Sequence, residues 1–556
     1  MVLDVLIKNG LVVDGTGNPW FRADVGVKDG RIVRVSRVVT EEADRVVNAD
    51  GLVVAPGFID LHNHSDMIEM AGSILLNRTA KNLVMQGITT VATGNCGYSA
   101  APLSEGLRER FRERVAKAVR AGVISELVEI DWLTMHEWMS RVENAGVSVN
   151  IAPFIGFGTV RESVMSDPDR VEPTEEELKE IKSMVREAMK DGAFGMTTGL
   201  EYYPQCNATV VEIVELLKVV AEYGGVYMSH IRSEDDYLIE AVREHIRICR
   251  LAGVPCCISH HKACGYRNWG KVYETVRLIE EARKEGVEMI CDCYPWESAA
   301  VCNLGELLVP DPVSREELLK YFKDDVKWEE IKEEAKKRLY QELKRNEEMR
   351  KVLGRRGSPY PIVWDPRTYH RIVYSKSRPD LVWKNFSEVA EILEVEDPWE
   401  AMRKLYIADD GETRVCIGDM REEDIIAVLK QSWTAVSTDA SADEGCRGLH
   451  PRSYGTYPKL FQRYVRELRI FSLEEAVRKA TSLPAQFLGL KDRGLIKEGF
   501  AADIVVFDPR KIECKATYAS PCRYPEGVRY VLVNGVLVVD EGEHTGELPG
   551  KVLKHQ

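Results

Sequence analysis

Histidine, cysteine and aspartate side chains follow predicted β-strands at several separate points of the chain. The first strand ends in His62-Asn63-His64, and because side chains alternate across a strand, both imidazoles can face one ion. Only eleven histidines occur in the 556 residues, and five of them stand at strand ends. These side-chain types are ligands that zinc takes in proteins. The further candidates, at the ends of four other strands, are Cys96, His230, His260-His261 and Asp439.

Each of these candidates has a structural explanation when it is taken alone. A cysteine in an apolar strand is usually a core residue. A histidine at a strand end can be a hydrogen-bonded structural residue, and an aspartate after a strand is often a cap or turn residue. Their joint placement on predicted strands one, two, five, six and eight is harder to explain in this way. The pattern therefore predicts one metal site to which several strands contribute.

The elements that must position these residues alternate between strand-like runs and amphipathic helical stretches, as βα units do. Helical runs are predicted, for example, over residues 175–190 and 212–223. Eight strands are predicted, the number that closes a TIM (β/α)8 barrel, where catalytic groups come from the C-terminal ends of the strands. The predicted strands end near Asp60–His64, Val91–Cys96, Pro153–Gly158, Met196–Gly199, Met228–His230, Ile258–His261, Asp292–Pro295 and Val436–Asp439.

Both ends of the chain have the pattern of short strands joined by tight turns. Asn9-Gly10 and Asn534-Gly535 are dipeptides typical of hairpin turns. We expect a small β-sandwich formed from residues 1–55 and 485–556, on either side of a barrel over residues 56–484. The span between strands seven and eight is longer than a βα unit requires. Its charge pattern predicts a helical insertion at about residues 300–370, either a solvated surface insertion or a lid over the barrel mouth.

Composition limits the classes of function. The formal net charge of −14 argues against general attraction to nucleic acid or to an anionic membrane surface. No segment approaches the run of about twenty apolar residues that crosses a bilayer, and the first residues lack the order of a secretory signal. We therefore expect a cytoplasmic protein. The thirteen cysteines do not have the spacing of a disulfide framework, so most are expected to be reduced core thiols.

Several stretches in order resemble the N-acyl-D-amino-acid deacylase (D-aminoacylase) family of the metal-dependent amidohydrolase superfamily. The opening of strand one is similar to that of the superfamily, and the other stretches are similar to this branch. The likeness runs from about Leu6 to Gly535 and is weakest between Ala299 and Tyr369. The stretches are Ala55-Pro56-Gly57-Phe58-Ile59-Asp60-Leu61-His62-Asn63-His64, Gly94-Asn95-Cys96-Gly97-Tyr98-Ser99, Gly199-Leu200-Glu201-Tyr202-Tyr203-Pro204, Ser229-His230-Ile231-Arg232-Ser233-Glu234, Ser259-His260-His261-Lys262, Asp292-Cys293-Tyr294-Pro295 and His450-Pro451-Arg452-Ser453-Tyr454-Gly455-Thr456-Tyr457-Pro458.

The resemblance implies a set of zinc ligands. Cys96, His230 and His260 would hold one tight zinc ion, and His62, His64 and Asp439 would form a second, weaker site. His260 is preferred to its neighbour His261 because it matches the family ligand, and adjacent strand residues also face opposite ways. Many binuclear amidohydrolases bridge their metals with a carboxylated lysine on strand four, which the segment 192–199 does not contain. A thiolate can supply the missing anionic ligand.

The same resemblance predicts the reaction and the substrate contacts. Zinc lowers the pKa of a bound water from about 15.7 towards 7, and Asp439 would take the water proton and pass it to the leaving amine. The expected partner is a small-molecule amide that carries a carboxylate. The residues matching family positions for substrate are Lys262, Tyr294 and Arg452, as carboxylate contacts, and Tyr202, without an assigned role.

Some residues depart from the family pattern, and they put the shape of the substrate pocket in doubt. Trp296-Glu297-Ser298 stands where the better-known enzymes have a Gly-Ser-Thr stretch, Ala440 follows Asp439 where a glycine is usual, and Gln205-Cys206 replaces a glycine-containing turn. Glu297 would repel an acidic substrate side chain if it faced the mouth of the barrel.

Two alternative functions stay open at this point. A cyclic-amide hydrolase of the hydantoinase or dihydroorotase kind is the nearest, and the missing strand-four lysine argues against it. A catalytically silent scaffold member is the other, and the full set of ligand types argues against it. The sequence leaves open the acyl group, the amino acid, its stereochemistry and the oligomeric state, a homo-oligomer included.

Overall fold

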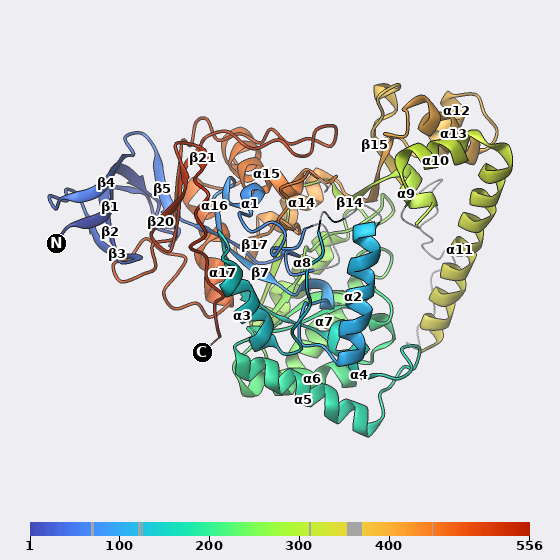
Figure 1. The fold of residues 1–556 in the computed structure, drawn as a ribbon, viewed down its shortest axis with the longest axis horizontal. Coiled ribbons are helices and arrows are strands. Elements are labelled where there is room, and N and C mark those ends of the chain that lie inside the picture. The colour runs from blue at the N-terminus through green and yellow to red at the C-terminus, as the bar shows by residue number, and fades with distance from the viewer. Residues whose placement is uncertain are drawn as a thin grey trace.

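The computed structural model describes residues 1–67, 72–120, 124, 126–310, 313–352, 370–446 and 449–555. Figure 1 shows three parts side by side: a β-sheet that contains both ends of the chain, a central body of parallel strands covered by helices, and a lobe of helices and short strands on the opposite side from that sheet. The central body holds the predicted ligands.

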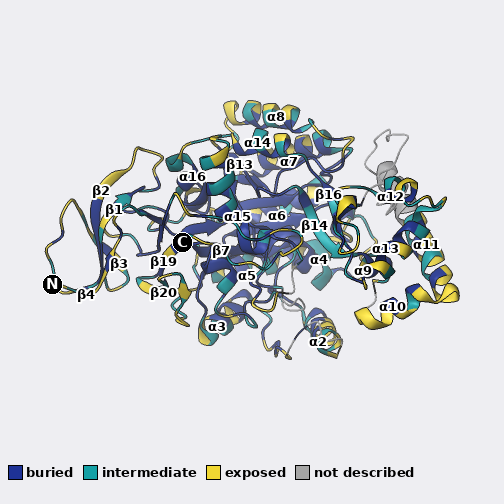
Figure 2. Ribbon diagram, turned by 90° about the horizontal axis from the view of Figure 1, so that it is seen from above, coloured by how far each residue is buried: buried dark blue, intermediate teal, exposed yellow. Residues whose placement is uncertain are grey.

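The central body contains two parallel sheets. One has the order β17-β13-β12-β11-β10-β9 and the other has the order β6-β7-β8, with every pair parallel. Every residue of these strands is buried, as expected where helices cover parallel sheets (Figure 2). The strands are β6 Phe58–Asp60, β7 Ile88–Thr93, β8 Asn150–Pro153, β9 Ile155–Gly156, β10 Gly195–Gly199, β11 Val226–His230, β12 Cys256–Ile258, β13 Met289–Cys293 and β17 Thr434–Val436.

Backbone hydrogen bonds connect the segments that follow the last and the first of these strands. The amide of Asp439 donates to the carbonyl of His62 over 2.9 Å, and the amide of His64 donates to the carbonyl of Ala440 over 2.8 Å. Between the two sheets, the amide of Phe154 donates to the carbonyl of Thr93 over 2.9 Å. Residues about 375 positions apart in the chain are thereby neighbours at the C-terminal ends of the strands.

Helices separate the parallel strands and begin at capping residues. The predicted run over 175–190 corresponds to α5, Glu175–Asp191, which begins with a capping box of Thr174 and Glu177. The run over 212–223 corresponds to α6, Val210–Glu222. Helices α7, Leu238–Ala252, and α8, Val272–Lys284, follow β11 and β12 and turn apolar faces to the sheet.

The sheet at the side of the molecule contains strands from both ends of the chain. It has nine strands, and β5 pairs antiparallel with β18, so the N-terminal and C-terminal strands share hydrogen bonds. Its division into two packed layers, as in a sandwich, stays a prediction. The strands are β1 Leu3–Val12, β2 Phe21–Lys28, β3 Arg31–Ser36, β4 Ala43–Asn48, β5 Val53–Pro56, β18 Ile504–Phe507, β19 Val528–Val533, β20 Val536–Asp540 and β21 Glu543–His544.

The described residues between Ser298 and Asp419, named here the inserted lobe, lie between β13 and β17. Besides the predicted helices they contain an antiparallel sheet of order β14-β16-β15, which the sequence did not predict. The lobe has its own apolar core, with Phe322, Trp328 and Tyr406 fully or almost fully buried. Residues 353–369 of the expected insertion lie outside the described part. The elements are β14 Ser298–Asn303, α9 Leu304–Leu308, α10 Arg315–Lys323, α11 Asp325–Val352, β15 Arg371–Tyr374, α12 Phe386–Ile392, α13 Pro398–Ala408 and β16 Arg414–Asp419.

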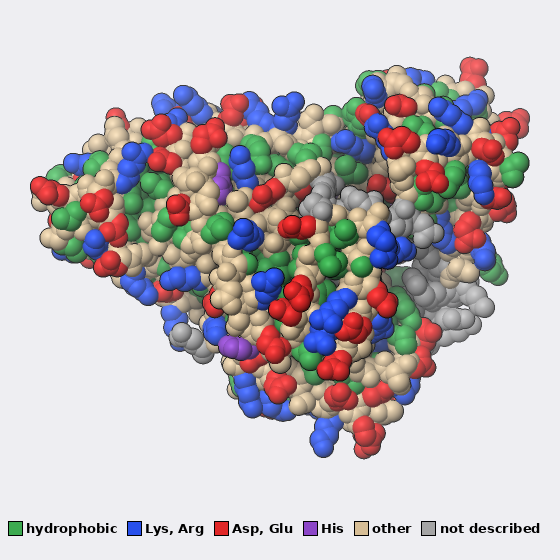
Figure 3. Space-filling model, viewed as in Figure 1, with side chains coloured by type: hydrophobic (Ala, Val, Ile, Leu, Met, Phe, Trp, Pro, Cys, Tyr) green, Lys and Arg blue, Asp and Glu red, His purple; other side chains and the backbone are tan. Residues whose placement is uncertain are grey.

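Most cysteines are free thiols, and most of these are buried. One disulfide, Cys446–Cys522, joins the loop after β17 to the C-terminal region, which sequence spacing did not predict. In the part of the chain that the structure describes, no helix has the length and apolarity needed to span a bilayer. Basic and acidic side chains are interspersed on the face shown in Figure 3.

Candidate active site

Three of the predicted site residues stand just after strands in an unusual backbone conformation. Cys96 has φ 53°, His260 has φ 37° and Asp439 has φ 49°. Side chains other than glycine rarely adopt positive φ, and such strain concentrates at functional sites. The turns at the ends of β7, β12 and β17 direct these three side chains to a common point instead of continuing the strand alternation.

The first donor group consists of Cys96, His230 and His260. The Sγ atom of Cys96 lies 3.9 Å from Nδ1 of His230 and 3.5 Å from Nε2 of His260. The two imidazole nitrogens are 3.2 Å apart. All three residues are buried, and their donor atoms lie within 4.8 Å of one another. The structure thus brings together the three residues predicted to hold the tight metal ion.

The second donor group lies beside the first. Nε2 of His64 is 3.2 Å from Oδ1 of Asp439, and Nε2 of His62 is 3.6 Å from the same oxygen. Nε2 of His62 also lies 3.3 Å from Sγ of Cys96, so the two groups are contiguous. Nδ1 of His62 lies 3.8 Å from the buried carboxylate of Asp292, and Nδ1 of His64 is buried without a hydrogen-bond partner.

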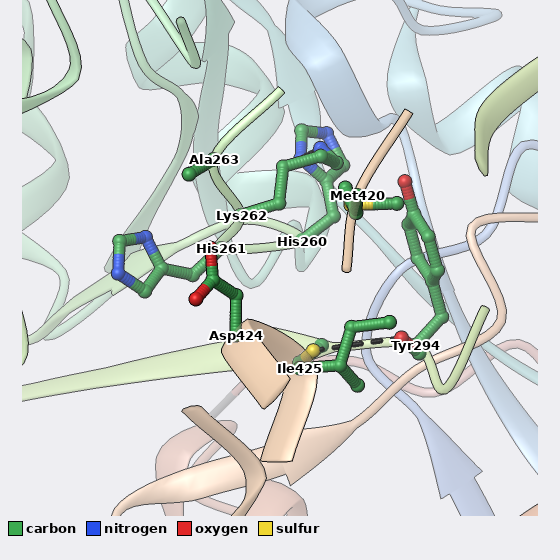
Figure 4. A pocket seen from close by; sticks show the side chains of 9 residues that line it. His260, His261, Lys262, Ala263, Tyr294, Met420, Asp424 and Ile425 are labelled. Atoms are coloured by element: carbon green, nitrogen blue, oxygen red, sulfur yellow. Dashed lines mark hydrogen bonds between the residues drawn. The ribbon is translucent and has the colours of Figure 1, made fainter. Parts of the chain in front are cut away.

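His261 lies apart from this cluster. Its Nε2 atom is 2.9 Å from the hydroxyl of Thr275 on α8. Figure 4 shows its ring pointing away from His260, on the far side of a small cavity from Lys262 and Tyr294. The sequence-based preference for His260 over His261 agrees with this arrangement.

The donor set fits a zinc ion. One thiol, four imidazoles and one carboxylate converge from the ends of five strands, and a tetrahedral zinc site takes ligands of these types. Strand β10 consists of glycine, methionine and threonine, so it supplies no bridging lysine. The thiol of Cys96 is the soft donor in that cluster, which favours zinc over hard cations such as Mg²⁺.

Electrostatics give Asp439 and Cys96 opposite protonation states. Burial by itself raises the pKa of Asp439, but the Arg452 guanidinium 2.8 Å away and the contact with His64 hold that pKa well below its usual range. Burial, assisted by the negative charge of Asp439, raises the pKa of the Cys96 thiol well above its usual range. Asp439 is therefore an ionised base, whereas Cys96 becomes a thiolate only when a cation is bound beside it.

His260 is held neutral and oriented by its neighbours. Burial and the charge of Lys262 lower the pKa of His260 to about 3, so its ring is a neutral ligand. Its Nδ1 atom lies 2.7 Å from Oε1 of Glu234 and 2.7 Å from Nζ of Lys262. That contact leaves Nε2 directed toward Cys96.

Sequence reasoning missed the carboxylates that contact the imidazoles. Glu234 contacts His260 and Lys262, the latter over 2.6 Å, and Oε2 of Glu201 lies 2.8 Å from Nε2 of His230. Carboxylates in this position orient the ligands of metal sites. Both glutamates lie in stretches that resemble the family. Their position just after β10 and β11 was the sequence feature that could have indicated them.

Two fully buried aspartates stand beneath the ligands. Asp60 accepts hydrogen bonds from the amide of Thr438 over 2.8 Å and from its hydroxyl over 2.5 Å, which ties the first strand to the last. Burial raises the pKa of Asp60 to about 7. Asp292 accepts from the amide of His260 over 2.9 Å and from the hydroxyl of Ser437. These bonds fix the turns that present His260 and Asp439.

The predicted substrate contacts surround the same point. Arg452 forms an ion pair with Asp439, with Nη1 2.8 Å from Oδ2. The Tyr294 ring lies 5.0 Å from that guanidinium and 5.5 Å from Nζ of Lys262. The Tyr294 hydroxyl is buried and has no hydrogen-bond partner. The Tyr202 hydroxyl lies 3.1 Å from Nδ1 of His230.

The negative charge of Glu297 is paired with a cation. Its carboxylate lies 3.2 Å from Nζ of Lys459, and that ammonium also lies 4.0 Å from the ring centre of Trp296. The Lys459 ammonium therefore offsets part of the repulsion that Glu297 was expected to exert on an acidic substrate, and an orientation of Glu297 toward the mouth stays a prediction.

Comparison with known proteins places this geometry in a family. Two models, both described as amidohydrolase family, match residues 53–293 and 428–539. The D-aminoacylase of Alcaligenes xylosoxydans xylosoxydans is 31% identical over 551 residues, which are 99% of this chain and 97% of the relative. A solved N-acyl-D-glutamate deacylase from Bordetella bronchiseptica, complexed with zinc and a phosphonate inhibitor, has a TM-score of 0.75 at 29% identity and covers 100% of both chains. A D-aminoacylase whose binuclear metal centre has been studied has a TM-score of 0.74 at 29% identity, over 99% of this chain and 100% of its own.

The fold and the donor cluster define an amidohydrolase. The two solved relatives named above are described with a bound metal centre. Within that class the chain belongs to the D-aminoacylase, or N-acyl-D-amino-acid deacylase, family.

The contacts of Glu234 lead to a testable prediction. Replacing it by Gln removes the charge that holds Lys262 and His260, so we expect metal affinity to fall by about 10- to 100-fold. Affinity is measured by competition with a chromogenic chelator. The matched control is Glu281→Gln, which removes an exposed carboxylate paired with Arg277 on α8 and should leave affinity unchanged. Equal affinities for the two variants would contradict the positioning role of Glu234.

Proposed function

We propose that this protein is a zinc-dependent hydrolase that removes the acyl group from N-acyl-D-amino acids. The observation that carries this proposal is the convergence of Cys96, His230 and His260 beside an ionised Asp439. Relatives named as D-aminoacylase and N-acyl-D-glutamate deacylase, alike over nearly the full chain, support the substrate class.

Cys96, His230 and His260 would hold the tight zinc ion, and His62, His64 and Asp439 a second, weaker one. The short distances within both groups support these assignments. Zinc bound there would supply Lewis-acid chemistry, polarising the scissile carbonyl and making a water molecule acidic enough to react near neutral pH.

Asp439 would move the proton during the reaction. Its Oδ1 faces His62 and His64 and its Oδ2 faces Arg452, so the carboxylate stands between the donor groups and the cationic side of the site. An ionised carboxylate there can accept a proton from the attacking water and deliver it to the nitrogen of the leaving amine. Without that proton an amine is a poor leaving group.

The substrate carboxylate would bind on the side of Arg452, Lys262 and Tyr294. A guanidinium offers several donors in one plane, so Arg452 can keep its bond to Asp439 and still bind an anion. The Tyr294 hydroxyl is a buried donor whose partner would be the substrate. Tyr202, partly exposed beside His230, would contact the acyl side.

On the fold, we propose that the two parallel sheets form one closed (β/α)8 barrel, in which β8 and β9 are two pieces of the third strand. The bonds from Asp439 to His62 and from Phe154 to Thr93 support this closure.

Replacing Asp439 by Asn tests the proton shuttle. The amide cannot accept the water proton, so we expect kcat to fall by about 10²- to 10⁴-fold while the tight zinc ion stays bound. Turnover is measured beside zinc content by elemental analysis. The control Asp492→Asn changes a partly exposed carboxylate that contacts Arg31 and should keep full activity. Near-normal turnover in the Asp439 variant would refute the assigned role.

Replacing Tyr294 by Phe tests the binding of the substrate carboxylate. Loss of a hydrogen bond to a charged group should lower kcat/KM by about ten- to a hundred-fold. Since the hydroxyl has no partner in the protein, Tm should not fall. Tyr406→Phe removes another buried, unpartnered hydroxyl, in the inserted lobe, and should change neither quantity. An unaltered KM and kcat for the Tyr294 variant would exclude this contact.

A substrate panel with metal removal and return tests the reaction itself. N-acetyl-D-amino acids, their L-enantiomers, hydantoins and dipeptides are assayed on chelator-treated protein, before and after zinc is added. We expect zinc-dependent release of acetate from D-substrates, including acidic ones. Opening of hydantoins without deacylation would favour the cyclic-amide alternative, and bound zinc with no turnover on any substrate would favour a silent member.

A further inference from the structure

A second group of metal-binding side chains lies outside the proposed active site. The donor atoms of His245, Cys249 and Cys256 all lie within 4.8 Å of one another. Their exposed fractions are 2%, 2% and 0%, so the group is closed off from solvent. No role in the proposed hydrolysis involves these residues.

The local fold directs the three side chains to one point. His245 and Cys249 are four residues apart on α7, so they lie on the same face of the helix. The chain then turns through Gly253 and enters β12 at Cys256, whose side chain faces the helix. Cys257, on the opposite face of the strand, is 3.5 Å from the carboxylate of Asp292 under the active site.

The His245 ring is an independent indication of a missing ligand. Both of its nitrogens are buried without a geometrically good hydrogen bond, and the polar group that acts on the ring is the Cys256 thiol of the same cluster. Buried polar groups nearly always have a partner, so such a ring needs one. Tyr227 stacks on the ring with centroids 5.1 Å apart and 24° between planes, which fixes its orientation. Cys249 and Cys256 are free thiols beside it.

This group is separate from the proposed zinc ligands. Cys256 opens β12, and His260 follows the other end of that strand. Four residues of extended chain span about 13 Å, so the two groups lie at opposite ends of the strand. Loading of one can therefore be measured independently of the other.

We propose that His245, Cys249 and Cys256 bind one thiophilic cation, Zn²⁺ or Cu⁺, that clamps the end of α7 to the start of β12. Two thiolates and an imidazole suit these soft cations. Binding releases the two thiol protons to solvent, and the imidazole donates a lone pair without changing charge. Among the described residues this group contains no fourth side-chain donor, so zinc would take a water as its fourth ligand.

The test is metal stoichiometry on the reduced, full-length protein. Wild type and a Cys249→Ser/Cys256→Ser variant are loaded in parallel with Zn²⁺ and with Cu⁺, desalted, and analysed for metal per chain. The control Cys291→Ser/Cys416→Ser replaces two other buried free thiols that belong to neither donor group. We expect the first variant to bind one ion fewer than wild type and control, in the zinc arm, the copper arm or both, with deacylase activity unchanged.

Equal stoichiometry for wild type and both variants would overturn the proposal, as would a Cys249–Cys256 disulfide found by mass spectrometry in the native protein. If the Ser variant does not fold, wild-type crystals decide: anomalous scattering at the zinc or copper edge should give a peak between the three side chains, and its absence after soaking would refute the site. A Cys96→Ser variant should lose the active-site ion and keep the ion bound by His245, Cys249 and Cys256. Failure of this proposal is therefore distinguishable from failure of the proposed hydrolase function.

Discussion

The pairing of the segment after β17 with the segment after β6 is the constraint on which the site depends. Asp439 donates its amide to His62, and the fully buried Asp60 accepts two hydrogen bonds from Thr438. These bonds join the segments that follow the first and the last parallel strand in chain order, and they bring the Asp439 carboxylate beside the imidazoles of His62 and His64. The same contacts hold Asp439 in a left-handed conformation that an isolated chain would avoid. Long-range backbone pairing thus determines where the carboxylate of Asp439 lies.

Charge in the cluster is balanced by pairs that share members. Arg452 keeps Asp439 ionised, while Glu234 contacts both Lys262 and His260. In a site from which water is largely excluded, each of these groups would be costly without its partner. The balance also leaves the Cys96 thiol neutral, so it can become a negatively charged thiolate when a cation binds beside it. Orientation and electrostatics are in this way supplied by the chain before any metal binds.

The residues that cluster at the candidate metal site could be predicted from sequence because each stands in a local pattern. His62 and His64 follow from strand alternation, and Cys96, His230 and His260 stand in short motifs at strand ends. The orienting role of Glu234 and Glu201 could not be predicted, since it depends on how loops after different strands fold over the imidazoles. The pairing of β14 with β16 was not predicted for a similar reason, because more than a hundred residues separate Ser298 from its partner Asp419. Glu297, in the loop before β14, pairs with Lys459 at the end of the helix Arg452–Lys459, and no local pattern indicates this partner.

The inserted lobe contacts the candidate site through main-chain carbonyls of β14, of which that of Ser298 accepts a hydrogen bond from His450 over 2.9 Å. The carbonyl of Ala299, on β14, accepts a hydrogen bond from Arg452 over 2.6 Å, and β14 pairs with β16 of the same lobe. The guanidinium proposed to bind the substrate is thus held by a segment that contributes none of the proposed metal ligands. A change in that segment can therefore displace Arg452, and with it the positive charge beside Asp439, without replacing any of the residues proposed as metal ligands.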